Sequence, residues 1–190
     1  MSPILGIIAS SISGSISANS YESIATVTLS ANQSSISFTS IPSTYKHLQI
    51  RGIARNSSVA SNDVEGLLVY YNGDTGLNYS AHYLQGNGST AYSAALLSTG
   101  YMYSGYTPTN GDTANVFSAT IIDILDYADT NKYKTQRVLT GVNTNVSGTE
   151  TIALFSGSWR STSAISSITL YSTSARNFRQ YSSFALYGVK

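Results

Sequence analysis

Cysteine is absent from this 190-residue sequence, and its absence excludes several kinds of chemistry at once. The chain can have no disulfide framework, no thiolate metal site and no cysteine nucleophile. Charged residues are also scarce, at 10% of the sequence against about a quarter of an average globular chain. The net charge is +1, and no cluster of lysine and arginine could neutralise several phosphates together. The composition therefore argues against nucleic acid as a partner.

A hydrophobic run long enough to cross a membrane is also missing. The apolar opening, residues 1–9 (MSPILGIIA), is far shorter than the roughly 20 residues that span a bilayer. It also lacks the basic segment with which a signal peptide begins. We therefore expect neither a signal peptide nor a membrane anchor, and no membrane partner.

The sequence does contain apolar and polar residues that alternate with a period of two. Ala25, Val27 and Leu29 share one face of an extended segment, while Thr26 and Thr28 share the other. Comparable runs occupy residues 36–38, 48–54, 67–71, 116–125, 133–142, 151–155, 165–171 and 184–189, and turn-forming residues at 72–76, 87–88, 109–112 and 147–148 separate several of them. This pattern predicts an all-β fold, a single-domain antiparallel β-sandwich of jelly-roll type over residues 20–190.

Three segments are less regular. Residues 77–84 could form at most two helical turns before Gly86 ends them, and residues 92–106, rich in Tyr and Gly, predict one strand and a long loop. Within residues 48–54, Ile53 breaks the alternation directly after Gly52, which predicts a β-bulge.

Residues 1–19 differ from the rest of the chain, because apolar side chains there precede a serine-rich stretch. We expect this segment to be either the first strand of the domain's own sheet or an extended N-terminal arm that buries its apolar end against another subunit. The candidate capsid or subunit contacts of such an arm are Ile4, Leu5, Ile7, Ile8, Ile12 and Ile16.

Catalytic motifs are absent from the sequence. It contains no nucleophile elbow, zinc-protease motif, phosphate loop or dinucleotide fingerprint. His47 begins a predicted strand, and His82 has no partner at the spacing of a metal ligand. Asp123, Asp126 and Asp129 do not match a known calcium loop, so acids that accept backbone N–H bonds in a turn are the favoured interpretation over an ion site. We predict that the protein is not an enzyme and has no cofactor.

Tyrosine is the most informative residue, with 15 copies against 5 phenylalanines and a single tryptophan. Its large ring and polar tip suit protein interfaces and sugar-binding platforms. The candidate loop contact surface consists of Tyr79, Tyr83, Tyr92, Tyr101, Tyr103 and Tyr106. Rings that are half-buried at the rim of the sandwich are the favoured alternative to such a surface.

Four segments carry a resemblance that extends over nearly the whole chain: residues 38–51 (FTSIPSTYKHLQIR), 122–127 (IDILDY), 131–134 (NKYK) and 184–190 (FALYGVK). The sequence resembles a family of small phage and prophage virion structural proteins of the capsid decoration (cement), head-fibre or tail-fibre type. The resemblance brings no catalytic residues with it.

The resemblance leads to two expected roles. The first is a capsid cement or decoration protein, a homotrimer on the outer surface of the virion that is assembled in the bacterial cytoplasm. Its arm, residues 1–19, would bind the major capsid protein and stabilise the shell. The second is a tail-fibre or receptor-binding domain whose tyrosines contact host surface glycan. The sequence contains no heptads or repeats of the kind found in fibre shafts, which favours the capsid role.

Overall fold

The computed structural model describes residues 20–59, 63–145 and 150–190. In these residues, β-strands form nearly all of the regular structure, and the single 3-10 turn, η1, covers Thr173–Ala175. The strands are β1 (Tyr21–Thr28), β2 (Ser35–Phe38), β3 (His47–Ala54), β4 (Val64–Tyr71), β5 (Tyr79–Gly86), β6 (Ala91–Thr99), β7 (Met102–Pro108), β8 (Ser118–Leu125), β9 (Lys134–Val142), β10 (Thr151–Trp159), β11 (Ile168–Ser172) and β12 (Ser183–Val189).

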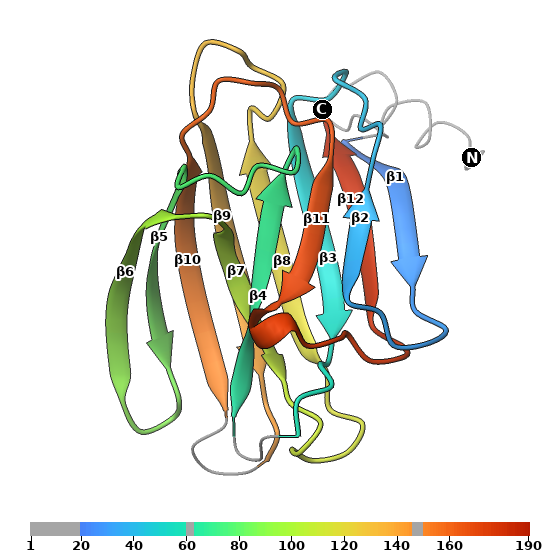
Figure 1. Cartoon of the computed structure of the whole chain (residues 1–190), viewed down its shortest axis with the longest axis vertical. Helices are drawn as coiled ribbons and strands as arrows, with labels where there is room; N and C mark the ends of the chain where they lie inside the picture. The colour runs from blue at the N-terminus through green and yellow to red at the C-terminus, as the bar shows by residue number, and fades with distance from the viewer. Residues whose placement is uncertain (1–19, 60–62, 146–149) are drawn as a thin grey trace, which may run out of the picture.

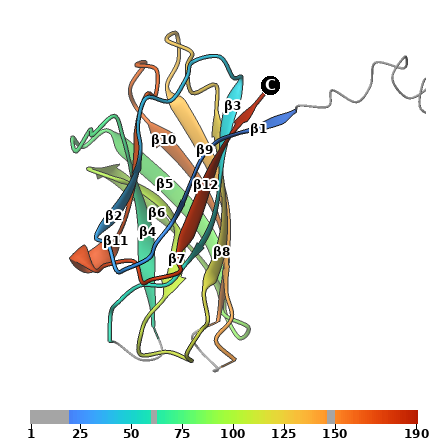
Figure 2. The same ribbon diagram turned by 90° about the vertical axis from the view of Figure 1, so that its right-hand side faces the viewer.

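The strands form two sheets that face each other (Figures 1 and 2). The large sheet has eight strands in the order β1-β12-β3-β8-β9-β10-β5-β6, and the small sheet has four in the order β2-β11-β4-β7. Every strand pair is antiparallel. The predicted all-β sandwich is therefore confirmed. In the described part of the chain, no helix is long and apolar enough to cross a membrane.

Four of the strand pairs are nested along the chain. β1 pairs with β12, β2 with β11, β3 with β8 and β4 with β7. Two hairpins interrupt this order, β5 with β6 and β9 with β10. Both hairpins join the large sheet beyond β8, and this makes it twice as wide as the small one.

The core lies between the two sheets and follows the alternation in the strands. Leu48 and Ile50 of β3 and Ile122 and Ile124 of β8 are almost fully buried, and Leu170 of β11 meets them from the small sheet. Strand β7 belongs to the small sheet but also packs on β8, β9, β10 and β5, so it covers the inner side of the added hairpins.

Two local predictions are wrong. Residues 77–84 contain most of strand β5 instead of helical turns, and residues 92–106 contain two strands, β6 and β7, instead of a strand and a long loop. The reason is tertiary: β5 pairs with β10 and β6, while β7 pairs with β4, so distant partners provide the hydrogen bonds.

The bulge predicted at Gly52 is also wrong, because β3 keeps an unbroken register with both β12 and β8. Gly52 is buried on the inner side, where a Cβ atom would lie 2.5 Å from the ring of Phe184. Glycine is needed here because the ring occupies that space. Ile53 keeps the alternation and points to the outer side of the large sheet, where it is 55% exposed.

Candidate interaction surface

A row of four large aliphatic side chains crosses the outer side of the large sheet. Ile121 of β8 lies opposite Leu139 of β9, Leu139 opposite Leu154 of β10, and Leu154 opposite Leu84 of β5. Their exposed fractions are 39%, 47%, 51% and 55% in that order along the row. Directly opposed side chains on one side of a sheet lie about 5 Å apart, so the four form a continuous apolar strip.

A second row runs beside the first and contains small residues between two large ones. Ile53 lies opposite Ala119, and Gly141 separates Ala119 from the 63% exposed Ile152. Next to Ile152, a shallow hollow of about 300 Å³ is lined by Leu84, Gly86, Ala91, Leu139, Ile152 and Leu154. We call the six large side chains of the two rows the apolar outer face: Ile53, Leu84, Ile121, Leu139, Ile152 and Leu154.

Charged residues border this face beside its first row, and Glu150 lies near Ile152 at the other end. Asp123 of β8 accepts hydrogen bonds from Gln49 Nε2 at 2.7 Å and from Arg137 Nη2 at 2.9 Å. Arg51 donates to Gln49 Oε1 at 2.8 Å, and its guanidinium lies over the ring of Tyr187. These groups are hydrogen-bonded to one another, and the border has one more positive than negative charge, because Asp123 faces both Arg51 and Arg137.

The outer side of the small sheet is different in character. Ser35 and Ser37 of β2 and Thr169 of β11 lie there, and the hydroxyls of Ser37 and Thr169 are hydrogen-bonded at 3.0 Å. The rings of Tyr70 and Tyr171 stack beside them with centroids 4.3 Å apart, so this side is aromatic and hydroxyl-rich rather than aliphatic. The aliphatic side of the large sheet is therefore a specific feature of one face of the molecule, and exposed apolar patches of this kind mark interaction sites.

The inner side of β9, which faces the core, contains several polar side chains. Gln136 accepts a hydrogen bond from Tyr71 OH at 2.6 Å and donates to Ser104 Oγ at 2.8 Å, while the hydroxyls of Thr140 and Thr120 are 2.9 Å apart. Each of these buried groups has a partner, as burial requires. The inner side of β9 thus combines hydrogen-bonded polar groups with the buried Val138 and Val142, while Leu139 lies outside.

The six candidate tyrosines do not gather on loops. Five lie on strands β5, β6 and β7, and Tyr101 lies between β6 and β7. Tyr79 is fully buried and Tyr106 is 7% exposed, so these two are removed from any contact surface of the single chain. Tyr83 and Tyr103 are half-buried and pack on Phe155, with ring centroids 5.3 and 5.6 Å from it. Only Tyr92, which is 44% exposed, presents much of its ring to solvent.

The buried phenols are held neutral by their surroundings. Burial raises the pKa of Tyr79, Tyr103 and Tyr106 far above the ordinary value, and it raises the pKa of Tyr71 similarly. Tyr106 OH donates to Gln85 Oε1 at 2.5 Å, a bond that the ionised form could not make. Tyr71, Tyr79 and Tyr106 are buried and stabilise the core, whereas Tyr103 is only half-buried.

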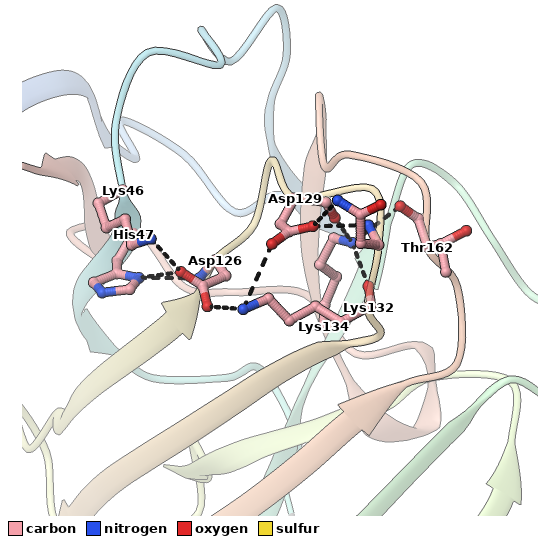
Figure 3. Close-up of polar contacts among 8 residues, drawn as sticks. Lys46, His47, Asp126, Asp129, Lys132, Lys134 and Thr162 are labelled. Atoms are coloured by element: carbon pink, nitrogen blue, oxygen red, sulfur yellow. Dashed lines mark hydrogen bonds and ion pairs between the residues drawn. The ribbon is translucent and has the colours of Figure 1, made fainter.

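The three aspartates considered for an ion site are divided between two places. Asp123 lies on the border of the apolar outer face, whereas Asp126 and Asp129 lie in the turn after β8 (Figure 3). In the described residues, no group of three or more histidine or acidic side chains could hold a metal ion. As the turn interpretation predicts, Asp129 Oδ1 accepts the backbone N–H of Asn131 at 2.7 Å.

Cations surround Asp126 in that turn. Lys132 Nζ lies 2.5 Å from Asp126 Oδ2, and Lys46 Nζ lies 3.4 Å from Oδ1. The hydrogen bond from Lys132 is the main reason that the pKa of Asp126 is lowered. His47 Nδ1 accepts the backbone N–H of Asp126 at 3.0 Å, which gives this histidine a structural contact, and His82 lies exposed on β5 opposite Ser156.

A buried lysine fastens the same turn to a distant loop. Lys134 is 1% exposed, and its ammonium donates to the carbonyl oxygens of Asp129, Lys132 and Thr162 at 2.5, 2.9 and 3.1 Å (Figure 3). Burial lowers the pKa of this lysine, although nearby Asp129 partly offsets the effect. All three ammonium protons therefore have backbone acceptors.

The fold and its surfaces define an antiparallel β-sandwich with one apolar outer face. In comparisons with known proteins, no family matches the chain and no curated protein is significantly similar to it. The candidate arm contacts, Ile4, Leu5, Ile7, Ile8, Ile12 and Ile16, lie outside the described residues.

The apolar outer face was not predicted from the sequence. Its signal is present as consecutive apolar residues within predicted strands, such as Ile121 with Ile122, Val138 with Leu139, and the run 152–155. Alternation with one polar side cannot produce such pairs, so they indicate strands that are apolar on both sides.

Proposed function

We propose that the protein is a non-catalytic phage virion structural protein of the capsid decoration type, which binds the major capsid protein and stabilises the shell. The observation that carries this proposal is the apolar outer face, a row of opposed aliphatic side chains on four neighbouring strands. A protein that works through contact area needs such a surface, because apolar burial is the main favourable term in association.

The size of the effect fits this role. Burying a fully exposed leucine or isoleucine contributes about 1.5–3 kcal/mol, so burying the exposed half of one contributes about 1 kcal/mol. The apolar outer face has six such side chains, and many copies on a shell would add their contributions. The outer surface of a virion is the location that this role implies.

The topology also supports the proposal. We infer that the sandwich is an expanded jelly roll, because removal of the hairpins β5-β6 and β9-β10 leaves two four-stranded sheets, β1-β12-β3-β8 and β2-β11-β4-β7. In these sheets the first strand pairs with the last, the second with the next to last, and so on inward. Jelly rolls are frequent in viral shells, and they also occur in lectins and cupins, so the topology supports the role without deciding it.

Co-sedimentation with undecorated capsids tests the proposal. We expect the wild-type protein to bind until a fixed ratio of copies to capsid protein is reached. The double variant L139S/L154S should lose at least tenfold in affinity, whereas L77S, which changes a 67% exposed leucine in a loop, should bind as the wild type does. Equal binding of all three proteins would contradict a docking role for the apolar outer face.

The copy number in purified virions separates the capsid role from the tail-fibre alternative. Hundreds of copies per particle are expected for a shell protein, and a handful would instead place the protein in the tail. Binding of the wild-type protein to host cells or surface glycan, without binding to capsids, would favour the receptor-binding alternative. In the structure, Tyr83 and Tyr103 pack against Phe155, which leaves little exposed ring area for a sugar.

A further inference from the structure

Strand β6 is an edge strand that the rest of the sandwich leaves open. It ends the large sheet (Figure 1), and among the described strands it pairs only with β5. Its side chains are exposed on both sides of the sheet. Its nine residues, AYSAALLST, include no charged residue and no proline. An edge of this kind offers unpaired backbone groups to an added strand, and proteins usually protect such edges.

The other three edges have recognisable protection. Glu22 on β1 forms an ion pair with Lys190 at 2.9 Å, and this strand has a register shift, as β6 also has near its end. β2 has only four residues. β7 is almost fully buried, because it packs on strands of the large sheet. Among the described strands, β6 alone is long, uncharged and open.

We propose that residues 11–18 of a second copy of this chain add to the large sheet as a strand beside β6. This segment, SISGSISA, alternates between serine and the series Ile12, Gly14, Ile16 and Ala18. Strict alternation over eight residues is the pattern of a strand with one apolar side. The inference does not rest on the proposed function, since it concerns only how copies of the chain bind one another.

The added strand has a matching surface to cover. Tyr92, Ala94 and Leu96 of β6 lie opposite Gln85, Tyr83 and Ala81 of β5, so they point to the inner side of the large sheet. β7 of the small sheet packs on β5, β8, β9 and β10, whereas β6 packs chiefly on β5, and Tyr92 remains 44% exposed. Ile12 and Ile16 would cover this side and leave the serines toward solvent. Neither strand has a charge that would have to be desolvated.

The geometry requires a second copy. β1 and β6 are the opposite edges of the large sheet, separated by seven strand spacings, or roughly 34 Å at about 4.8 Å each. Only residues 19 and 20 connect the segment to β1, and two residues reach about 7 Å. The segment therefore cannot reach β6 of its own chain.

Each chain gives one strand and accepts one, so the contact is head-to-tail. Such a contact forms either a closed ring or an open filament. A ring of three would satisfy every β6 edge and would agree with the homotrimer that the resemblance implies.

Disulfide trapping tests the contact directly, because the natural chain has no cysteine. The full-length double variant S15C/A95C places one thiol in the segment and one on β6. Mild oxidation should convert most of this variant to disulfide-linked multimers, and reduction should return them to single chains. The matched control S15C/S35C places the second thiol on an exposed residue of β2, another edge strand, and should give at most one-tenth of that yield.

Light scattering provides a second measurement that does not depend on the register. The wild-type chain should have a mass that is a multiple of 20.2 kDa. I12K/I16K should fall to 20.2 kDa, with at least tenfold faster amide exchange in residues 91–99. S11K/S15K adds the same charges to the serine side and should keep the wild-type mass.

Three outcomes would overturn the inference. They are a wild-type chain of 20.2 kDa, an I12K/I16K variant that keeps the wild-type mass, and multimers of the single variant A95C that match the yield of S15C/A95C. The last would mean that β6 pairs with β6 of another copy. Capsid binding is measured separately, so a failure here leaves the proposed function standing.

Discussion

Leu139 of β9 lies directly opposite Leu154 of β10 on the outer side of the large sheet, and about half of each side chain is exposed. Both strands belong to the hairpin that widens this sheet beyond the small one. The hairpin therefore extends the apolar outer face beyond the nested pair β3–β8, which provides Ile53 and Ile121. Its inner side is covered by β7, whereas its outer side has no cover from the described residues.

Substitution of Gly52 with alanine should destabilise the fold. The new Cβ would lie 2.5 Å from the ring of Phe184, and overpacking of this kind costs about 1–3 kcal/mol. Gly141→Ala is the matched control, because a Cβ there meets no atom within 4 Å. Urea unfolding should show a lower midpoint for G52A and an unchanged or slightly higher one for G141A. Equal midpoints would contradict the described packing of Phe184 on β3.

Substitution of Lys134 with methionine should also destabilise the fold, although methionine has a similar length and is apolar. The change leaves the carbonyl oxygens of Asp129, Lys132 and Thr162 without their donor. Unsatisfied buried acceptors cost about 1–3 kcal/mol, and we expect a loss of about 2 kcal/mol in the free energy of unfolding. Lys46→Met, at a side chain that is 68% exposed, should leave the unfolding midpoint unchanged. A K134M variant as stable as the wild type would refute the anchoring role.

Stability should fall as the pH rises above about 10, the ordinary pKa of tyrosine. Burial raises the pKa of Tyr71, Tyr79, Tyr103 and Tyr106 in the folded chain, so above this pH the unfolded chain has lost protons that the folded chain keeps. The unfolded state is then favoured progressively. Phenolate absorbance and circular dichroism, followed together, should show a group of tyrosines that ionises only as the sheet signal disappears. Ionisation of all tyrosines in one step while the chain remains folded would contradict this account.

The sequence was sufficient to predict the strands whose alternation follows burial, as in Ala25, Val27 and Leu29. It was insufficient for β5, β6 and β7, because their hydrogen bonds come from distant strands that local patterning does not identify. The sequence also led to a wrong prediction of a bulge at Ile53. The alternation there is intact, but the outer side of the strand is itself apolar. A single strand's pattern shows that its two sides differ, but only the assembled sheet shows which side faces the core.

The candidate site was predicted less well for a related reason. Tyr79 and Tyr106 were chosen for their chemistry, and the structure uses that chemistry in the core, where Tyr79 OH donates to the carbonyl of Asp74 at 2.9 Å. The apolar outer face arises only when the consecutive strands β8, β9 and β10 pair with the distant β5 and align Ile121, Leu139, Leu154 and Leu84.

The central claim is that the apolar outer face is buried when the protein is assembled into the particle. Hydroxyl-radical footprinting of the free protein and of purified virions measures this directly, because it reports the solvent access of individual side chains. We predict that oxidation of Leu84, Leu139 and Leu154 falls at least fivefold in the virion, while that of Tyr133, which precedes β9 and is 55% exposed, stays the same. Equal oxidation of the three leucines in both samples would contradict the account.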